Sequence, residues 1–432
     1  MSLTGWGNYP KSQNTAVKYD KQDDLKALIA QHNDVIPHGN GRSYGDSAIG
    51  KTIIKVKPHD LFLDFDSDKG ILRVEAGVLL ADIIKAMVPR GWFLKIVPGT
   101  KLITVGGAIA SDVHGKNHHV AGCFSESVET FKLMLPDGSV VDCSKTENNE
   151  LFQATCGGMG LTGVIVEATL SLKKINSKTI QQTTIKNQNL KETFAAFEQY
   201  RDVPYSVAWI DCLAKGDNIG RSLLMVGDFC DDGKLKYESP AKPAIPFNFP
   251  VFALNPLSVK AFNWLYYAKV TKAVSKQKVS IDTFFFPLDA IGHWNRIYGR
   301  NGFTQYQFIL PKESSFEGLE TILQAISDSN KGSFLAVLKL YGPANDNYLS
   351  FPLEGYSLAL DFKIEKGLFA LLDQLDQIVV EHGGRIYLAK DARVSKTVFE
   401  AGYPHIEKFR ALRSQYQMDQ KFNSFQSKRL EI

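Results

Sequence analysis

Residues 104–119 have the sequence T-V-G-G-A-I-A-S-D-V-H-G-K-N-H-H. The small residues of its first half allow the backbone to lie close to a flat or phosphorylated ligand. The second half carries His114, His118 and His119, a spacing that metal sites also use. No cysteine is adjacent and carboxylates are sparse, so we expect no metal; histidines satisfied one by one in the fold are the simpler interpretation.

A second glycine-rich segment precedes this one. Residues 39–46 are G-N-G-R-S-Y-G-D, and they follow an apolar run that favours a strand. Glycines can take positive φ angles and turn several N–H groups to one side, which makes a concave site for phosphate oxygens. A plain tight turn would use the same residues, so this segment alone leaves both interpretations open.

A third segment, G-G-M-G-L-T-G at 157–163, contains a literal G-x-G-x-x-G match. A dinucleotide-binding Rossmann site needs a strand before the glycines and a helix after them. Here residues 151–155 favour a helix and residues 164–172 alternate like a strand, which excludes NAD binding at this motif. One extended ligand that touches several loops, such as a dinucleotide, would explain three small-residue segments in the first 165 residues.

Composition excludes several other classes. The chain has 432 residues, 44% hydrophobic and 22% charged, which is typical of a globular protein of two or three domains. The net charge of +4 is too small for a general nucleic-acid binder. Five scattered cysteines predict free, mostly buried thiols. No apolar run reaches the roughly 18 residues of a membrane span, and the polar start lacks a signal pattern, so we expect a cytoplasmic protein.

The order of strands and helices predicts an α+β protein. Composition becomes polar and poor in glycine at 173–184, where we expect a domain boundary. Beyond it, a mainly antiparallel sheet with intervening helices is expected. Its predicted strands are 208–211, 222–227, 283–286, 305–310, 334–340 and 357–362, its predicted helices 258–276, 315–328 and 366–382, and a charged, largely helical tail follows from 385 to 432.

With these segments, the chain resembles the FAD-linked oxidases of the vanillyl-alcohol-oxidase superfamily. Within that superfamily it is most similar to the oxidases of polyprenylphosphoryl ribose. Both H-G-K-N-H-H and Y-L-A-K-D carry the resemblance, which spans nearly the whole chain. Its strings are G-W-G at 5–7, G-R-S-Y-G-D at 41–46, P-G-T at 98–100, the stretches at 104–119 and 157–163, Q-Y-Q-F at 305–308, K-L-Y-G-P at 339–343, G-G-R-I-Y-L-A-K-D-A-R at 383–393 and R-L-E-I at 429–432.

The resemblance implies a two-domain FAD-linked oxidase fold of the α+β class. An FAD-binding domain would comprise residues 1–175 and the C-terminal segment 385–432, and a substrate-binding domain would comprise 176–384. Relatives that bond FAD covalently carry a histidine where this chain has Arg42, which implies non-covalent FAD. The implied cofactor-binding residues are Pro37, His38, Gly39, Asn40, Gly41, Arg42, Ser43, Tyr44, Gly45, Asp46, Ser47, Gly99, Thr104, Val105, Gly106, Gly107, Ser111, Asp112, Val113, His114, Ile165 and Tyr387.

The resemblance also implies the catalytic residues Lys390 and His114. A lysine whose pKa is lowered by burial can act as a base, or its charge can stabilise reduced flavin. Without the resemblance, Lys390 would be interpreted as a surface lysine paired with an aspartate. The implied substrate-binding residues are Gln305, Gln307, Lys339 and Tyr44, and Lys339 suits a phosphate; as ordinary strand residues, the first three would face solvent.

One position departs from the family pattern. Mycobacterial relatives carry a cysteine in the strand that precedes their V-D-F triplet, and nitroaromatic inhibitors capture that thiol. In this chain the strand is Y-S-L-A-L-D-F at 356–362, with Ala359 at the position of the cysteine. The resemblance therefore does not extend to that inhibitor chemistry.

Residues 233–278 form a basic and aromatic stretch. They include eight lysines, no arginine, one acidic residue and eight aromatic residues. Such a stretch can be a loop over a pocket with solvated lysines. It can also be a lid that rests on an anionic membrane and receives a lipid-linked substrate.

The resemblance implies oxidation of the 2-hydroxyl of a polyprenylphosphoryl-β-D-ribose to the 2-keto sugar. This step would be the first half of an epimerisation to the arabinose form in cell-envelope polysaccharide biosynthesis, and a separate NAD-dependent keto-reductase would complete it. The alternatives are an oxidase of a soluble sugar or aldonolactone with the same flavin fold, and an idle flavoprotein that serves as a scaffold. The expected location is the cytoplasm or the periphery of the inner membrane, with an exported complex as the alternative.

Overall fold

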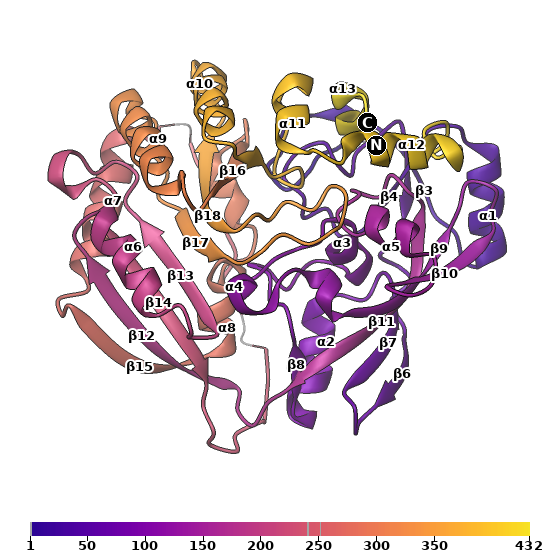
Figure 1. The fold of residues 1–432 in the computed structure, drawn as a ribbon, viewed down its shortest axis with the longest axis horizontal. Helices are drawn as coiled ribbons and strands as arrows, with labels where there is room; N and C mark the ends of the chain where they lie inside the picture. Colours follow the sequence, from indigo (N-terminus) through magenta and orange to yellow (C-terminus); the bar gives the residue numbers. More distant parts are fainter. Residues whose placement is uncertain (1, 240–241, 251) are drawn as a thin grey trace.

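The computed structural model describes residues 2–239, 242–250 and 252–432. Figure 1 shows two halves side by side: the N-terminal strands with the C-terminal helices, and a second half that contains a large sheet. Both chain ends lie in the first half. The α+β class predicted from the sequence is confirmed, and each half contributes one wall of the functional site described below.

The first half contains two larger sheets. One is parallel, with β5 between β3 and β4. The other is antiparallel and has the order β10-β9-β11-β7-β6, with β8 also paired to β11. The alternation expected in a half-buried strand is clear in β7, where Leu72 and Val74 are buried. The elements are β1 (Ser2–Leu3), β2 (Ser12–Gln13), β3 (Thr15–Val17), α1 (Gln22–Gln31), β4 (Val35–His38), β5 (Thr52–Lys55), β6 (Phe62–Asp66), β7 (Ile71–Glu75), α2 (Leu80–Met87), β8 (Trp92–Leu94), α3 (Val105–Ala110), α4 (His118–Ala121), β9 (Val128–Met134), β10 (Val140–Ser144), α5 (Asn149–Thr155) and β11 (Val164–Lys174).

The C-terminal tail packs on this first half. Arg413 is buried, and its guanidinium donates hydrogen bonds to the carbonyl oxygens of Leu161 and Phe422 at 3.2 and 2.6 Å. Arg429 joins two buried carboxylates, those of Asp46 and Asp391, at 2.9 and 2.8 Å. The tail therefore holds both the first glycine-rich segment and the segment next to Lys390. Its helices are α11 (Lys396–Gly402), α12 (Ile406–Gln415) and α13 (Phe425–Leu430).

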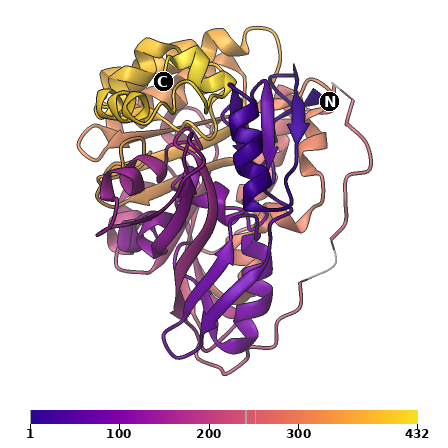
Figure 2. The ribbon, with the colours of Figure 1, turned by 90° about the vertical axis from the view of Figure 1, so that its right-hand side faces the viewer.

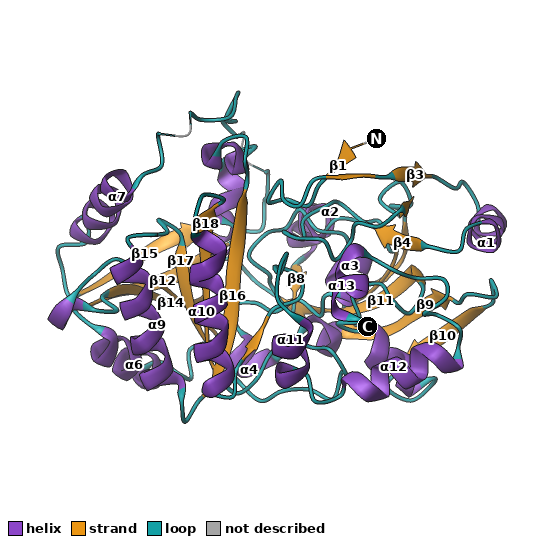
Figure 3. Cartoon of the chain, turned by 90° about the horizontal axis from the view of Figure 1, so that it is seen from above, coloured by secondary structure: helices purple, strands orange, loops and turns teal. Residues whose placement is uncertain are grey.

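The second half is built on one antiparallel sheet of eight strands with the order β15-β12-β14-β13-β17-β18-β16-β19. Seen from above in Figure 3, α6, α9 and α10 lie on one face of this sheet and α7 lies beyond the other. Side chains that alternate along a strand point to opposite faces, so one face packs on helices and the other is free to line a site. The elements are β12 (Thr179–Asn187), α6 (Leu190–Gln199), β13 (Tyr205–Ile210), β14 (Ser222–Phe229), α7 (Pro256–Ala268), β15 (Val274–Ser280), α8 (Ile281–Phe285), β16 (Phe303–Pro311), α9 (Ser315–Ser329), β17 (Ala336–Tyr341), β18 (Gly355–Lys363), α10 (Leu368–Glu381) and β19 (Arg385–Ile386).

Two sequence-based predictions in this half are wrong. The strand predicted at 283–286 is the short helix α8, because the Ser280 hydroxyl accepts a hydrogen bond from Thr283 N and caps a helix start. The helix predicted over 258–276 ends at Ala268, and the chain continues as β15, which pairs with β12 at the edge of the sheet. Strand pairing outweighs the helical spacing there.

Two other predictions are confirmed, on the order of elements around the third glycine-rich segment and on the cysteines. The helix α5 precedes the third glycine-rich segment and β11 follows it, which is the reverse of the Rossmann order. All five cysteines are free; four are buried and Cys230 is partly exposed. Within the described ranges, no helix is both long and apolar enough to cross a bilayer.

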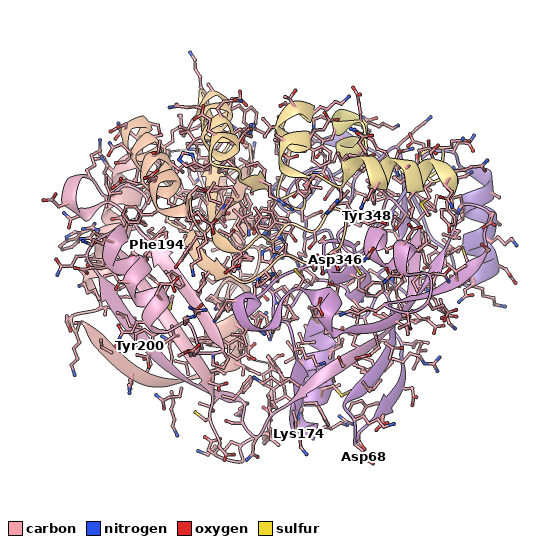
Figure 4. The ribbon with its side chains drawn as sticks, viewed as in Figure 1. Asp68, Lys174, Phe194, Tyr200, Asp346 and Tyr348 are labelled. Carbon is pink, nitrogen blue, oxygen red and sulfur yellow. The ribbon has the colours of Figure 1, made fainter. Side chains whose placement is uncertain are left out.

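A buried carboxylate connects the two halves. Asp112, which has a positive φ of 36°, is completely buried and accepts hydrogen bonds from Ser125 N at 2.9 Å and from Ser350 Oγ at 2.7 Å. It also accepts from the side-chain amides of Asn345 and Asn347, both at 2.8 Å. These last residues belong to the loop between β17 and β18, which crosses to the first half and is marked in Figure 4 by the labels of Asp346 and Tyr348.

We predict that Asp112→Asn lowers the free energy of unfolding by about 2–4 kcal/mol, because a neutral amide accepts these hydrogen bonds more weakly. Urea titration followed by tryptophan fluorescence measures this change. The matched control is Asp346→Asn, at an exposed position on the same loop, with an expected change within about 0.5 kcal/mol. Equal stability of the two variants would contradict the role of Asp112.

Candidate active site

A cavity of about 1000 Å³ lies between the two halves. One wall is made by the glycine-rich segments of the first half. The other is the face of the large sheet opposite α6, α9 and α10, which exposes side chains at alternate strand positions. These side chains are Gln182 and Thr184, Val207 and Trp209, Leu223 and Met225, Gln305 and Gln307, Val337 and Lys339, and Ala359.

The structure brings most of the residues implied by the family resemblance to this cavity. All of the implied catalytic and substrate-binding residues line it, and so do most of the implied cofactor contacts. The residues are Pro37, Gly39, Asn40, Gly41, Arg42, Ser43, Tyr44, Ser47, Gly99, Thr104, Gly106, Gly107, Ser111, Val113, His114, Ile165, Tyr387, Gln305, Gln307, Lys339 and Lys390.

Five implied cofactor contacts, His38, Gly45, Asp46, Val105 and Asp112, do not line the cavity. The Nδ1 atom of His38 donates to the Ala48 carbonyl oxygen at 2.8 Å, and Val105 is fully buried in the apolar core. At Gly45 a Cβ atom would lie 1.7 Å from the carbonyl oxygen of Asp391. These residues support the cavity wall from behind, as Asp46 and Asp112 do through their buried hydrogen bonds.

The cavity wall fits an extended ligand with phosphates and a flat ring. A Cβ atom at Gly39 would lie 2.4 Å from Thr104 Oγ1, so only glycine allows the first and second segments to meet there. At Gly99 a Cβ atom would meet nothing within 4 Å, which leaves open space beside the backbone. Two buried donors on the wall, Arg42 Nε and His114 Nδ1, have no hydrogen-bond partner among the residues that the structure describes. A dinucleotide would supply partners for such groups, and FAD therefore fits.

His114 is held as a neutral ring. Gln307 Nε2 donates to His114 Nε2 at 3.1 Å, which assigns the ring proton to Nδ1. The rings of Tyr341, Phe351 and Tyr387 surround the imidazole, with centroids 5.0–5.5 Å away. Burial and the nearby Lys339 lower the pKa of His114 well below its usual value. The residue can donate one hydrogen bond to a ligand, but it is poorly suited to carry a positive charge.

Lys390 lies on the same cavity, with its ammonium 3.8 Å from the centroid of the Tyr44 ring. Burial is the main cause that lowers its pKa to about 7; Asp361 opposes this shift and Lys339 reinforces it. Asp361 itself accepts a hydrogen bond from Gln305 Nε2 at 2.6 Å, and burial raises the pKa of its carboxyl group. The interpretation of Lys390 as a surface lysine paired with an aspartate is therefore wrong, because Lys390 faces the cavity and the carboxylate of the neighbouring Asp391 pairs with Arg429 at 2.8 Å.

Two further lysines face the cavity without a carboxylate partner. Lys116 donates to the carbonyl oxygen of Phe284, with the Phe284 ring 4.8 Å from its nitrogen. Lys339 forms no hydrogen bond or ion pair with any residue that the structure describes. Burial lowers the pKa of Lys116 to about 7 and that of Lys339 to about 8. Cations desolvated in this way attract an anionic ligand.

Sequence reasoning missed several residues of this site. Lys116 stands inside the H-G-K string, and Asp361 follows Ala359 at the next position on the same strand face, so both had a signal. Gln182, Thr184 and Trp209 had none, because only the strand register shows which face of the sheet they are on. No group of three or more potential metal ligands occurs in the part of the chain described here.

Comparison with known proteins gives a consistent result. A family model described as "FAD binding domain" matches residues 15–144. Decaprenylphosphoryl-beta-D-ribose oxidase from Mycolicibacterium smegmatis is 34% identical, and the alignment covers 100% of this chain and 97% of the relative. L-gulonolactone oxidase from Mus musculus is 33% identical over 34% of each chain. Delta(24)-sterol reductase from Homo sapiens is 33% identical over 26% of this chain and 21% of the relative.

We predict that the flavin leaves the protein on denaturation, because Arg42 offers no nucleophile for a covalent bond. Acid precipitation should leave the yellow colour in the supernatant, and an intact-mass spectrum should show the bare polypeptide. A polypeptide heavier by the mass of FAD would contradict this prediction.

Proposed function

Since the chain belongs to the family of FAD-binding oxidases that includes decaprenylphosphoryl-β-D-ribose oxidase, we propose that it oxidises the 2-hydroxyl of a polyprenylphosphoryl-β-D-ribose to a ketone. The chain is an FAD-dependent oxidoreductase. When bound, FAD supplies the hydride acceptor for the carbinol carbon. The protein must then bind the sugar, hold it in position and take the hydroxyl proton.

The observation that carries the substrate proposal is the charge inside the cavity. Lys339 helps to lower the pKa of both Lys116 and Lys390, and Asp361 opposes that shift at Lys390. A phosphate of the substrate placed between Lys116 and Lys339 would neutralise this excess charge. Gln305 and Gln307 present amide groups on the same sheet face, which suits the hydroxyls of a sugar.

We propose that Lys390 accepts the proton of the substrate hydroxyl. Its lowered pKa leaves a substantial neutral fraction near pH 7, and a neutral amine can accept a proton. Asp361 lies on β18, and its carboxylate stabilises the ammonium that forms on Lys390. His114 has the wrong pKa for this role, so it orients a ligand through its Nδ1–H. The ketone product requires a separate reductase, of the NAD-dependent class, to give the arabinose form used in cell-envelope polysaccharides.

Anaerobic reduction of the bound flavin by a panel of sugars tests the function. The panel contains a polyprenylphosphoryl ribose, ribose 1-phosphate, free ribose and an aldonolactone. We expect bleaching of the flavin band by the lipid-linked ribose, weaker bleaching by ribose 1-phosphate and none by the other two. Bleaching by free ribose or the lactone alone would support the soluble-sugar oxidase instead. Flavin that no sugar reduces would support the scaffold interpretation.

We predict that the rate of flavin reduction rises with pH through about 7 and then levels, because Lys390 must be neutral to accept the proton. Lys390→Arg keeps the charge and removes the base, so it should slow reduction by about 10²–10⁴-fold and abolish this limb of the profile. An unchanged flavin spectrum confirms that FAD is still bound. A Lys390→Arg protein that retains the rate and the pH profile would show that the charge, and not a base, is what the reaction needs.

A further inference from the structure

Exposed apolar side chains gather on one segment of the second half. Of the thirteen large hydrophobic side chains exposed among the described residues, seven lie between 247 and 274. Figure 2 shows the described residues between β14 and α7 running along the outside of the molecule, away from the packed layers. The seven side chains are Phe247, Phe252, Leu257, Phe262, Trp264, Leu265 and Val274.

The helix α7 carries apolar side chains on its outward face as well as on its inward face. Its inward face holds the buried Val259 and Asn263, and Asn263 donates a hydrogen bond to Asp211 at 2.9 Å. Its outward face carries Leu257, Trp264 and Leu265, which are 78%, 59% and 60% exposed. These positions follow the i, i+7, i+8 spacing of one helical stripe. An apolar stripe that faces outward needs an occupant to remove it from water.

The charge around this stripe indicates what kind of surface binds there. The stretch 233–278 has a net charge of +7, from eight lysines and one glutamate. Lys242 and Lys260 are exposed, and Lys260 lies on α7 itself. Lys276 and Lys278 belong to the edge strand β15, where lysines block unwanted strand pairing. Exposed tryptophan, phenylalanine and leucine bordered by lysines match the interface of a bilayer with anionic headgroups.

The same segment forms part of the cavity wall. Tyr266 lies one residue beyond Leu265, and its ring lies 4.7 Å from that of Trp209 on the sheet face. The cavity lining continues from there through Lys269, Val270, Thr271 and Lys272. The apolar stripe and the cavity therefore lie on two sides of one short piece of chain.

We propose that α7, together with the exposed Phe247 and Phe252 that precede it, docks on an anionic membrane surface and holds the mouth of the cavity against it. A lipid-linked sugar then reaches the cavity while its hydrocarbon chain stays in the bilayer; this consequence, though not the docking itself, rests on the function proposed above. The bilayer is favoured over a protein partner because the stretch that carries the apolar stripe has a net charge of +7.

Vesicle co-sedimentation of the FAD-loaded protein tests this proposal. The vesicles contain phosphatidylglycerol and phosphatidylcholine, or phosphatidylcholine alone. We expect binding to the anionic vesicles that weakens by about tenfold or more in 0.5 M salt, where surface charges are screened. Trp264→Ser with Leu265→Ser, and separately Lys242→Gln with Lys260→Gln, should each lower the partition coefficient by about tenfold or more. The matched controls are Leu61→Ser, at a side chain 63% exposed in the first half, and Lys11→Gln with Lys51→Gln, which should bind as the parent does.

A second measurement separates docking from catalysis. Reduction of the flavin by a short-chain substrate dissolved in detergent should be the same in the parent and in all of these variants. Absence of vesicle binding, or equal binding by the α7 and control variants, would overturn the docking proposal while leaving the proposed reaction intact. Capture of a second protein by the parent with no vesicle binding would assign the stripe to a protein partner and would also overturn the proposal.

Discussion

The carboxylate of Asp112 is the contact on which the site depends. It lies two residues before His114, in a turn that a positive φ angle makes possible. Its oxygens accept hydrogen bonds from the first half and from the loop that crosses over from the second. Nearby, Gly342 N donates to His118 Nδ1 at 3.1 Å, so the same motif is fixed at a second point. The glycine-rich wall and the sheet wall of the cavity therefore hold a fixed separation.

The chemistry of the cavity follows from how few counter-charges it contains. Charges removed from water are costly unless they are paired, and here Asp361 acts on Lys390 while Lys116 and Lys339 have no carboxylate partner among the described residues. Such an arrangement is unfavourable in the empty protein and becomes favourable when anions bind. The phosphates of FAD and of a phosphorylated substrate are anions of the required kind. The lowered pKa of Lys390 and the neutral state of His114 are results of the same desolvation.

Much of the site could be predicted from the sequence, because short strings of glycine, histidine and lysine carry it. The α+β class and the reversed order around the third glycine-rich segment also followed from local patterns. The helix expected over 258–276 could not be bounded, because β15 exists only through its pairing with β12. Similarly, Trp209 and Gln182 became site residues through the register of an eight-stranded sheet. Asp112 looked like a cofactor contact in the string, and only the crossing loop, more than 200 residues later, shows its structural role.

The central claim is that this cavity removes hydrogen from C2 of a lipid-linked ribose. Anaerobic stopped-flow reduction of the bound flavin by substrate deuterated at C2, beside substrate deuterated at C3, tests that claim most directly. We expect slower flavin reduction with the C2-deuterated sugar and an unchanged rate with the C3-deuterated sugar. Slower reduction only with the C3-deuterated sugar would contradict this claim. Equal rates for the two deuterated sugars and the undeuterated sugar would also contradict it, provided that the chemical step limits the rate.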